Sequence, residues 1–242
     1  MTRSKFDWSI LDRNSLYCYL WGVSDKIVGH PLFVPDIHKI LANQLKTYLP
    51  IRVIKRFNEK VEFGYIYIGG AYYSDYDQDH EKCIEINFSY NPFEEKITLS
   101  KLRFKRMCML FADTLLHEII HMRQYRRRDY RVLPDYPSTA EKEEQRLEQR
   151  YLGCTDEIDA YGFNIACELT EKFSGDHKKI VKYLNENQKN KSGRNNCWKD
   201  YVRAFDYNHN HPVIQKLKKK IIQYLPNAEI GKPYRNKDWI NY

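Results

Sequence analysis

The stretch His117-Glu118-Ile119-Ile120-His121 decides how this chain is interpreted, because it places two histidines four residues apart with a glutamate directly after the first. On an α-helix, residues four apart lie one above the other on the same face. Two imidazoles in that arrangement can bind one Zn²⁺ through their ring nitrogens, and the glutamate can reach a water on the ion and act as a general base. The stretch therefore predicts a metal site, provided that it lies on a helix.

The surrounding residues predict such a helix, because residues 101–128 contain neither glycine nor proline and Thr98 or Ser100 can cap their start. Apolar residues recur every three to four positions, which is typical of a helix with one buried face. They are Phe104, Met107, Phe111, Leu115, Ile119 and Met122. A helix that buries this face can turn both histidines toward a cleft.

A third metal ligand is required, because catalytic zinc usually has three protein ligands and one open position. A second helix is predicted from Thr155, a plausible N-cap followed by acidic residues that the helix dipole favours, to Leu169. Glu157 lies one turn before Ala160 on this helix, and Ala160 and Gly162 are small enough for another helix to approach closely. These features favour Glu157 as the third ligand.

The two helices together resemble those of the zincin metallopeptidases whose third ligand is a glutamate, the gluzincins. The run E-x-x-A-x-x-F-x-x-A-x-x-L from Glu157 to Leu169 is similar to the ligand helix of compact intracellular members, the ImmA/IrrE type. The resemblance implies that His117, His121 and Glu157 bind one Zn²⁺ and that Glu118 is the catalytic base. Peptide or protein substrates would be hydrolysed there.

The resemblance covers roughly residues 60–170 and departs from the family in the connection between the helices. Residues 122–156 number 35 and are strongly charged, which indicates an inserted surface element, with a short charged helix expected near 141–151. In zincins the strand before the H-E-x-x-H helix commonly forms the edge of the cleft and can pair with an extended substrate. The resemblance gives that role to the strand predicted at residues 83–90.

Other ligands and catalytic residues are open at this stage. Asp159 would correspond to the aspartate-type zincins, and His177, His209 or His211 to histidine-type arrangements, including the SprT-like proteases. Asp113, one turn before His117, can orient an imidazole or can be a solvated or capping carboxylate. A histidine or tyrosine outside the ligand set often stabilises the oxyanion in zinc peptidases. The catalytic candidates are His211 and Tyr161, with His209 and Tyr151 as alternatives.

The order of elements predicts an α+β fold. Helices are expected at 11–23 and 37–48, strands at 51–57, 61–73 and 83–90, a polar turn at 74–82, and helices near 177–188, 197–207 and 213–224. We interpret residues 1–50 as a helical lead and residues 51–170, with the insertion 122–156, as a zincin-like domain containing a small mixed or antiparallel sheet. Residues 171–242 then form a basic helical extension packed on that domain.

Positive charge is concentrated in residues 171–242, which contain 16 Lys and Arg against 7 Asp and Glu, a net charge of +9. The whole chain has a net charge of +8, so the remaining residues are close to neutral. Lys216, Lys218, Lys219 and Lys220 form a basic patch. Nucleic acid or another polyanion is a possible partner of this region, and a solvated helix face is the alternative. The chain could therefore be a protease tethered to nucleic acid, or a non-catalytic binding or assembly protein that retains a zincin fold.

Composition excludes several other classes of protein. We expect no signal segment and no membrane span, because no apolar run approaches the ~20 residues that a span requires. The six cysteines are scattered without a C-x-x-C pair, which argues against a zinc knuckle and against a disulfide-stapled secreted scaffold. A reduced, cytoplasmic protein of bacterial or viral origin is the expectation.

Overall fold

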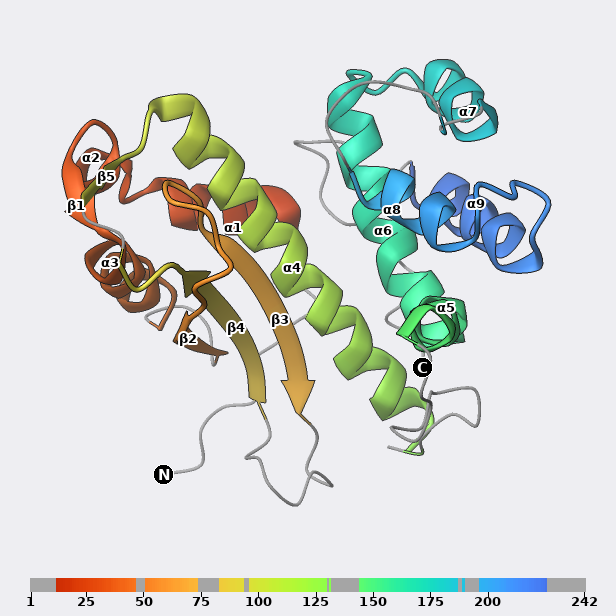
Figure 1. Ribbon diagram of the computed structural model, residues 1–242, viewed down its shortest axis with the longest axis horizontal. Helices are drawn as coiled ribbons and strands as arrows, with labels where there is room; N and C mark the ends of the chain where they lie inside the picture. The colour runs from red at the N-terminus through yellow and green to blue at the C-terminus, as the bar shows by residue number, and fades with distance from the viewer. Residues whose placement is uncertain are drawn as a thin grey trace. The chain divides into compact units, whose positions relative to one another are not determined.

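The computed structural model describes residues 12–46, 51–73, 83–93, 96–129, 131, 144–186, 189 and 196–225. These residues form a mixed α+β structure that is mostly helical and contains small sheets (Figure 1). They divide into two compact units, one ending at Met122 and the other beginning at Arg123. The division falls inside one continuous helix, α4 (Lys101–Arg127), so that this helix belongs to both units.

The first unit contains three helices and five strands before α4 among its described residues. They are α1 (Arg13–Trp21), α2 (Ser24–Ile27), β1 (Pro31–Phe33), α3 (Val34–Lys46), β2 (Ile51–Phe57), β3 (Tyr67–Tyr73), β4 (Cys83–Tyr90) and β5 (Lys96–Thr98). The predicted strands 51–57 and 83–90 are confirmed. The short antiparallel pair β1 and β5 was not predicted, because three residues are too few to show an alternating pattern.

The predicted strand 61–73 is too long, because only Tyr67–Tyr73 is a strand. The preceding residues turn instead. The N–H of Val61 donates to the carbonyl of Asn58, the N–H of Tyr65 donates to that of Glu62, and Gly64 has a φ of 81°, which glycine adopts at no steric cost. The turns bring the chain back so that β3 can pair with β4.

The three-stranded sheet has the order β2–β4–β3, with β2 parallel and β3 antiparallel to β4. The strand at 83–90, expected to form the edge of the cleft and to pair with an extended substrate, is β4; the expected pairing is wrong, since β4 already pairs with β2 on one side and β3 on the other. Its alternating Ile84, Ile86 and Phe88 correctly indicate one core-facing side. Alternation reports which face is buried, however, and says nothing about how many neighbouring strands there are. The edge beside α4 belongs to β3.

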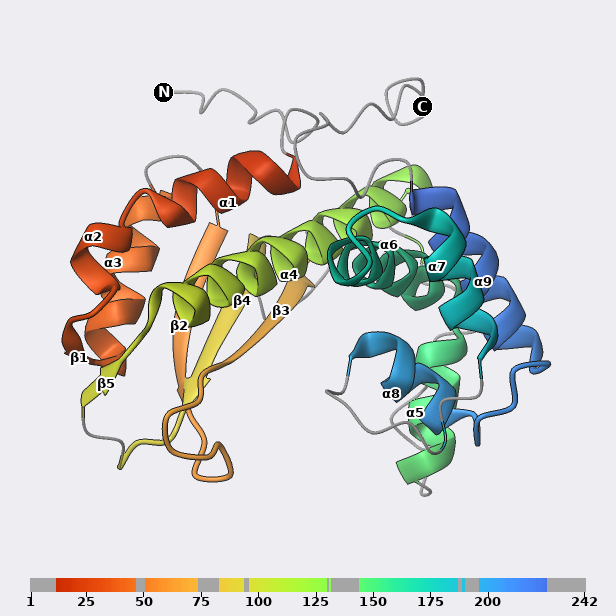
Figure 2. The same ribbon diagram turned by 90° about the horizontal axis from the view of Figure 1, so that it is seen from above.

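Helices α1, α3 and α4 supply the core of this unit. The ring of His38 in α3 packs edge-on against Phe88, and its Nε2 lies 3.0 Å from the carbonyl oxygen of Val53 in β2. Trp21 of α1 packs against Phe104 of α4, with ring centroids 5.6 Å apart. Figure 2 shows α4 running along the sheet from its N-terminal end beside β5. All six apolar positions expected on the buried face of this helix are buried, which confirms its periodicity.

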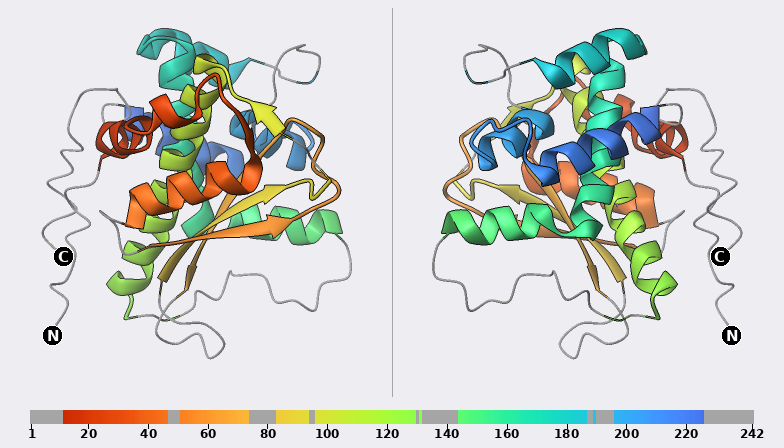
Figure 3. Two further views of the ribbon diagram at one scale, coloured as in Figure 1. Left: turned by 90° about the vertical axis from the view of Figure 1, so that its left-hand side faces the viewer. Right: turned by 90° about the vertical axis from the view of Figure 1, so that its right-hand side faces the viewer.

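The second unit is helical. After the last turn of α4 it contains α5 (Glu144–Gly153), α6 (Thr155–Lys172), α7 (His177–Asn185), α8 (Cys197–Ala204) and α9 (Pro212–Tyr224). Helix α9 crosses α6 closely (Figure 3). A Cβ built at Gly162 would stand 2.8 Å from Cβ of Lys220, which confirms that a small residue here admits another helix. Helix α8 contributes the buried side chains of Trp198 and Tyr201 to the core of this unit.

Helix boundaries in this unit differ from the expected ones by a few residues. Helix α6 starts at Thr155, but the N-cap position is held by Cys154 without a side-chain hydrogen bond, so the prediction of Thr155 as the cap is wrong. Helix α8 ends at Ala204 because Asp206 and Tyr207 have φ values of 54° and 57°. At the start of α4, in the first unit, Ser100 does act as the expected cap, since its Oγ accepts the N–H of Arg103.

Some expectations concern residues outside the described ones. The polar turn at 74–82 and part of the charged insertion, residues 130 and 132–143, are in this group. Across the ranges that the structure describes, no helix combines the length and the apolar character that crossing a membrane demands.

Candidate metal centre

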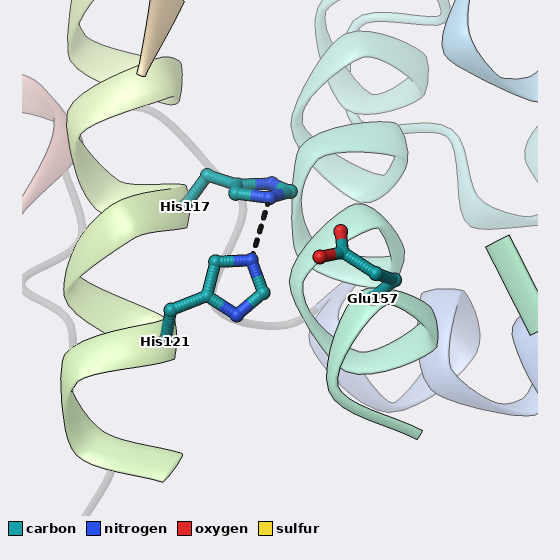
Figure 4. A group of neighbouring side chains, drawn as sticks. All are labelled: His117, His121 and Glu157. Carbon is teal, nitrogen blue, oxygen red and sulfur yellow. Dashed lines mark hydrogen bonds between the residues drawn. The ribbon is translucent and has the colours of Figure 1, made fainter. Parts of the chain in front are cut away.

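The two histidines of the H-E-x-x-H stretch project from the same face of α4 (Figure 4). Their Nε2 atoms lie 3.0 Å apart, with ring centroids at 4.7 Å and planes at 75°. Two ligands of one tetrahedral zinc ion, each about 2.0–2.1 Å from it, stand about 3.3 Å apart. The spacing of the two nitrogens is thus close to the spacing that a shared metal ion demands.

Glu157 provides a carboxylate from the first turn of α6 and is 1% exposed. Ligand atoms of His117, His121 and Glu157 all lie within 4.8 Å of one another (Figure 4). Within the described part of the chain, this is the one group of at least three His, Cys, Asp or Glu side chains close enough to share an ion. Two imidazoles and a carboxylate match a known donor set of catalytic zinc, which leaves a fourth position open.

The last turn of α4 explains how the first turn of α6 is held. Gln124, three residues after His121, donates a hydrogen bond of 3.0 Å to the backbone carbonyl of Asp156. Arg128 binds both carboxylate oxygens of Asp156, at 2.7 and 2.5 Å. Since Glu157 is the next residue, these contacts fix the segment that carries it against the end of the histidine helix.

Asp156 therefore does more than supply a favourable charge at a helix start. Its carboxylate is buried, and the guanidinium of Arg128 also lies over the ring of Tyr125, with Cζ 4.6 Å from the centroid. Burial by itself lowers the pKa of Arg128, but the hydrogen bonds and charge of Asp156 outweigh that effect and leave this pKa raised. Arg128 is therefore cationic at every physiological pH and keeps its positive charge beside Asp156.

Glu118 is 6% exposed and its side chain lies against the backbone of β3. A Cβ built at Gly70 would stand 2.6 Å from Oε1, 2.7 Å from Cγ and 3.0 Å from Cδ of Glu118. Only a glycine leaves room for the carboxylate in this position. Sequence reasoning missed Gly70, because a glycine inside a strand signals a close approach without naming what approaches.

Asp113 is neither solvated nor a cap. Both of its carboxylate oxygens bind Arg13 of α1, at 2.5 Å from Nε and 2.9 Å from Nη2, and both side chains are nearly buried. The pair joins α1 to α4 one turn before His117. It fixes the N-terminal helix to the helix that carries the histidines.

Asp159, the rival third ligand, is engaged elsewhere. Its Oδ1 accepts a hydrogen bond of 2.9 Å from the hydroxyl of Tyr224 and lies 2.8 Å from Nζ of Lys220, while Oδ2 accepts from Gln124. Asp159 thus ties α6 to α9 and to the end of α4. It does not belong to the cluster of ligand atoms.

The other candidate histidines lie at helix starts or pack against aromatic rings. His177 begins α7, and His209 packs edge-on against Trp198 with ring centroids 6.0 Å apart. Burial, followed by the charge of Lys218, lowers the pKa of His209. His211 is the N-cap of α9, where its Nδ1 accepts the N–H of Val213, and its ring packs on Phe205.

The tyrosine candidates lie on the second unit's helices. Tyr161 is half-buried on α6, one turn after Glu157, and packs edge-on against Tyr201; Tyr151 lies on α5. The sequence patterns did not indicate Tyr201 as a residue near the site. It donates a hydrogen bond of 2.9 Å to the carbonyl of Leu152, and burial, followed by the negative charge of Glu157, raises its pKa well above the ordinary value. Its spacing in α8 indicates only a core residue, so no pattern could have singled it out.

Two of the four lysines in the basic patch of α9 make contacts inside the second unit. Lys218 is buried, donates to Oδ1 of Asn185 at 2.9 Å and has a pKa lowered by burial. Lys220 binds Asp159. Lys216 and Lys219 are exposed.

Comparison of the chain with protein-family models, with curated proteins and with solved structures gives no match. The site is therefore interpreted from its own chemistry. Imidazole and carboxylate donors suit zinc, and the buried Glu118 next to His117 adds a group that can accept a proton.

Proposed function

We propose that this chain is a zinc-dependent peptidase with a zincin-like fold. The observation that carries the proposal is the convergence of ligand atoms of His117, His121 and Glu157 within 4.8 Å. A mixed sheet followed by the histidine helix and a ligand helix supports the same class of fold. One Zn²⁺ per chain is the proposed cofactor.

The three ligands would hold the ion, and Glu118 would perform the proton transfers. Zinc held by these residues would supply a Lewis acid for the scissile carbonyl and would bring the pKa of a nearby water toward neutrality. Glu118 accepts a proton from the attacking water and returns it to the leaving amine. Its burial against β3 keeps the carboxylate in one position and away from bulk water, which favours both transfers.

Strand β3 would align the substrate. Among the described residues it is one of the two edge strands of its sheet, with β2 at the other edge, and Gly70 in its middle touches Glu118. An extended peptide that adds to this edge gains backbone hydrogen bonds and passes the general base. This role moves from the strand at 83–90, where the resemblance had put it, to Tyr67–Tyr73.

Tyr161 and His211 stay in the proposal as residues that could stabilise the oxyanion. Tyr161 has the better support, because it follows Glu157 by one helical turn, whereas Nδ1 of His211 already accepts a backbone N–H. The proposal also includes a reducing cytoplasmic location, which the six free cysteines support. Tethering to nucleic acid has less support, because Lys218 and Lys220 are engaged in internal contacts.

The test is the variant Glu118→Gln, assayed on a fluorescently labelled unfolded protein. We expect it to retain zinc and to lose hydrolysis by a factor of about 10² or more, because general base catalysis contributes 10²–10⁴-fold. Glu148→Gln changes an exposed glutamate of α5 in the same way and should leave the rate unchanged. A Glu118→Gln protein as active as wild type would eliminate the proposed base. A zinc-loaded wild type that hydrolyses no polypeptide would favour a binding protein instead.

A further inference from the structure

Five large aromatic side chains are exposed at one end of the three-stranded sheet in the first unit. Each is between 59% and 71% exposed, and together we call them the aromatic end: Phe57, Phe63, Tyr65, Tyr67 and Phe93. Aromatic rings bury 150–250 Å² each, so leaving five of them exposed at one end of a sheet is unfavourable unless a partner covers them.

The strand register explains why these residues share one end of the sheet. Phe57 is the last residue of β2 and lies opposite Tyr90, the last residue of β4. Tyr67, the first residue of β3, lies opposite Ser89 of β4. Phe63 and Tyr65 belong to the connection from β2 to β3, and Phe93 follows β4 by three residues. Figure 2 shows the β2–β3 connection and the chain leaving β4 at the same end of the sheet.

The aromatic end is continuous with the edge strand of the candidate site. Tyr67 precedes Gly70 by three residues, which is about 10 Å along a strand at about 3.3 Å per residue. Gly70 contacts Glu118, and the ring of Tyr67 extends along the strand to within 3.3 Å of a Cβ position at Gly69. A chain bound along β3 at Glu118 therefore reaches the aromatic end three residues away.

The charges around the aromatic end do not favour a polyanion. Lys55 and Lys60 are offset by the exposed Glu59 and Glu62. The guanidinium of Arg56 is engaged by Asn87, at 2.5 Å, and by Glu85, at 3.3 Å. Single-stranded nucleic acid requires a basic groove beside its stacking platform, and this surface is close to electrically balanced.

We infer that the aromatic end is a docking surface for apolar side chains of an extended polypeptide. The inference rests on the proposed function and names its substrate class: unfolded chains with an apolar stretch about three to six residues from the bond to be cleaved. A folded protein buries such stretches and cannot lay an extended segment along β3. The surface thus selects unfolded segments of protein over folded ones.

Binding can be tested without hydrolysis in a Glu118→Gln background. Two labelled 14-residue peptides that differ only in a four-residue stretch, Phe-Leu-Phe-Leu or Ser-Gln-Ser-Gln, are titrated by fluorescence anisotropy. We expect the apolar peptide to bind at least tenfold more tightly than the polar one, and the double variant Phe63→Ser/Phe93→Ser to remove this difference. Phe33→Ser, an exposed aromatic of β1, is the matched control and should preserve it.

Three results would overturn the inference: equal affinity of the apolar peptide for the double variant and its parent, salt-sensitive binding of a 20-residue oligo-dT that the double variant loses, or a dimer that the double variant converts to monomer. Failure of the proposed function gives a different pattern. A wild type without hydrolysis whose aromatic end still selects the apolar peptide keeps the docking surface and removes the peptidase.

Discussion

Gly70 and Glu118 are in direct contact: the space in which a side chain at residue 70 would begin is occupied by the carboxylate of residue 118. The contact joins β3, an edge strand of the sheet, to the glutamate that directly follows His117. It fixes where a proton acceptor stands relative to any chain bound along β3. Both residues are in the first unit, so this relationship depends on the packing of α4 against the sheet alone.

The substitution Gly70→Ala is expected to displace Glu118 and to leave the metal ligands in place. Hydrolysis should fall about tenfold or more, because a misplaced general base loses part of its 10²–10⁴-fold contribution, while zinc content stays unchanged. Gly153→Ala is the control, because Gly153 lies in α5, outside the proposed site, and its new methyl group meets nothing closer than the side chain of Val213 at 3.4 Å. Steady-state kcat/KM with metal analysis checks the prediction, and equal losses in both variants would contradict it.

The histidine helix could be predicted from sequence because a long amphipathic pattern without glycine or proline has one structural solution. The sheet could be predicted only in part. Alternation located β4 but could not show that it has a neighbouring strand on each side. The predicted strand 61–73 was too long because the turn at Gly64 was not recognised. The contacts of Asp113, Asp156 and Asp159 join residues far apart in sequence. No local pattern encodes such contacts, so the structural roles of these three carboxylates could not be predicted from sequence.

The ion pair between Arg13 and Asp113 should stabilise the first unit. Arg13→Met leaves the nearly buried carboxylate without this guanidinium and should reduce the free energy of unfolding by about 3 kcal/mol, since loss of one member of a buried pair costs about 3–5 kcal/mol. Arg13→Met/Asp113→Leu should recover much of the loss. Urea denaturation measures both. Arg103→Met, an exposed control on α4, should change stability by less than about 0.5 kcal/mol.

If the double variant were no more stable than Arg13→Met, the loss would come from the packing of the arginine side chain and not from the isolated charge.

His209 should make the protein less stable in mild acid. Its pKa in the folded chain is lowered, chiefly by burial and then by the charge of Lys218. As pH falls through the ordinary histidine value of about 6.5, the unfolded chain takes up a proton that the folded chain refuses, so the free energy of unfolding decreases; above that pH the contribution is absent. His209→Gln should lose less stability than wild type between pH 7.5 and pH 5.5 in urea titrations. Parallel curves for the two proteins would exclude this residue as the cause.

Cysteine reactivity should follow burial. The thiol of Cys108 is buried in α4, and desolvation raises its pKa to about 12, so it has almost no thiolate at pH 8. Cys18 is exposed on α1. Iodoacetamide at pH 8 should modify Cys18 in minutes and leave Cys108 unmodified until urea unfolds the protein. Peptide mass spectrometry reads both sites, and equal labelling rates in the native protein would contradict the packing of α4.

The central claim is that His117, His121 and Glu157 bind one zinc ion. Elemental mass spectrometry of the purified, metal-replete protein tests it most directly, with His117→Ala and Glu157→Ala beside Asp159→Asn, whose carboxylate is engaged by Lys220 and Tyr224. We predict one zinc per chain in the wild type and in Asp159→Asn, and loss of zinc in the two alanine variants. Wild-type protein that binds no zinc, or zinc that survives Glu157→Ala but not Asp159→Asn, would contradict the claim.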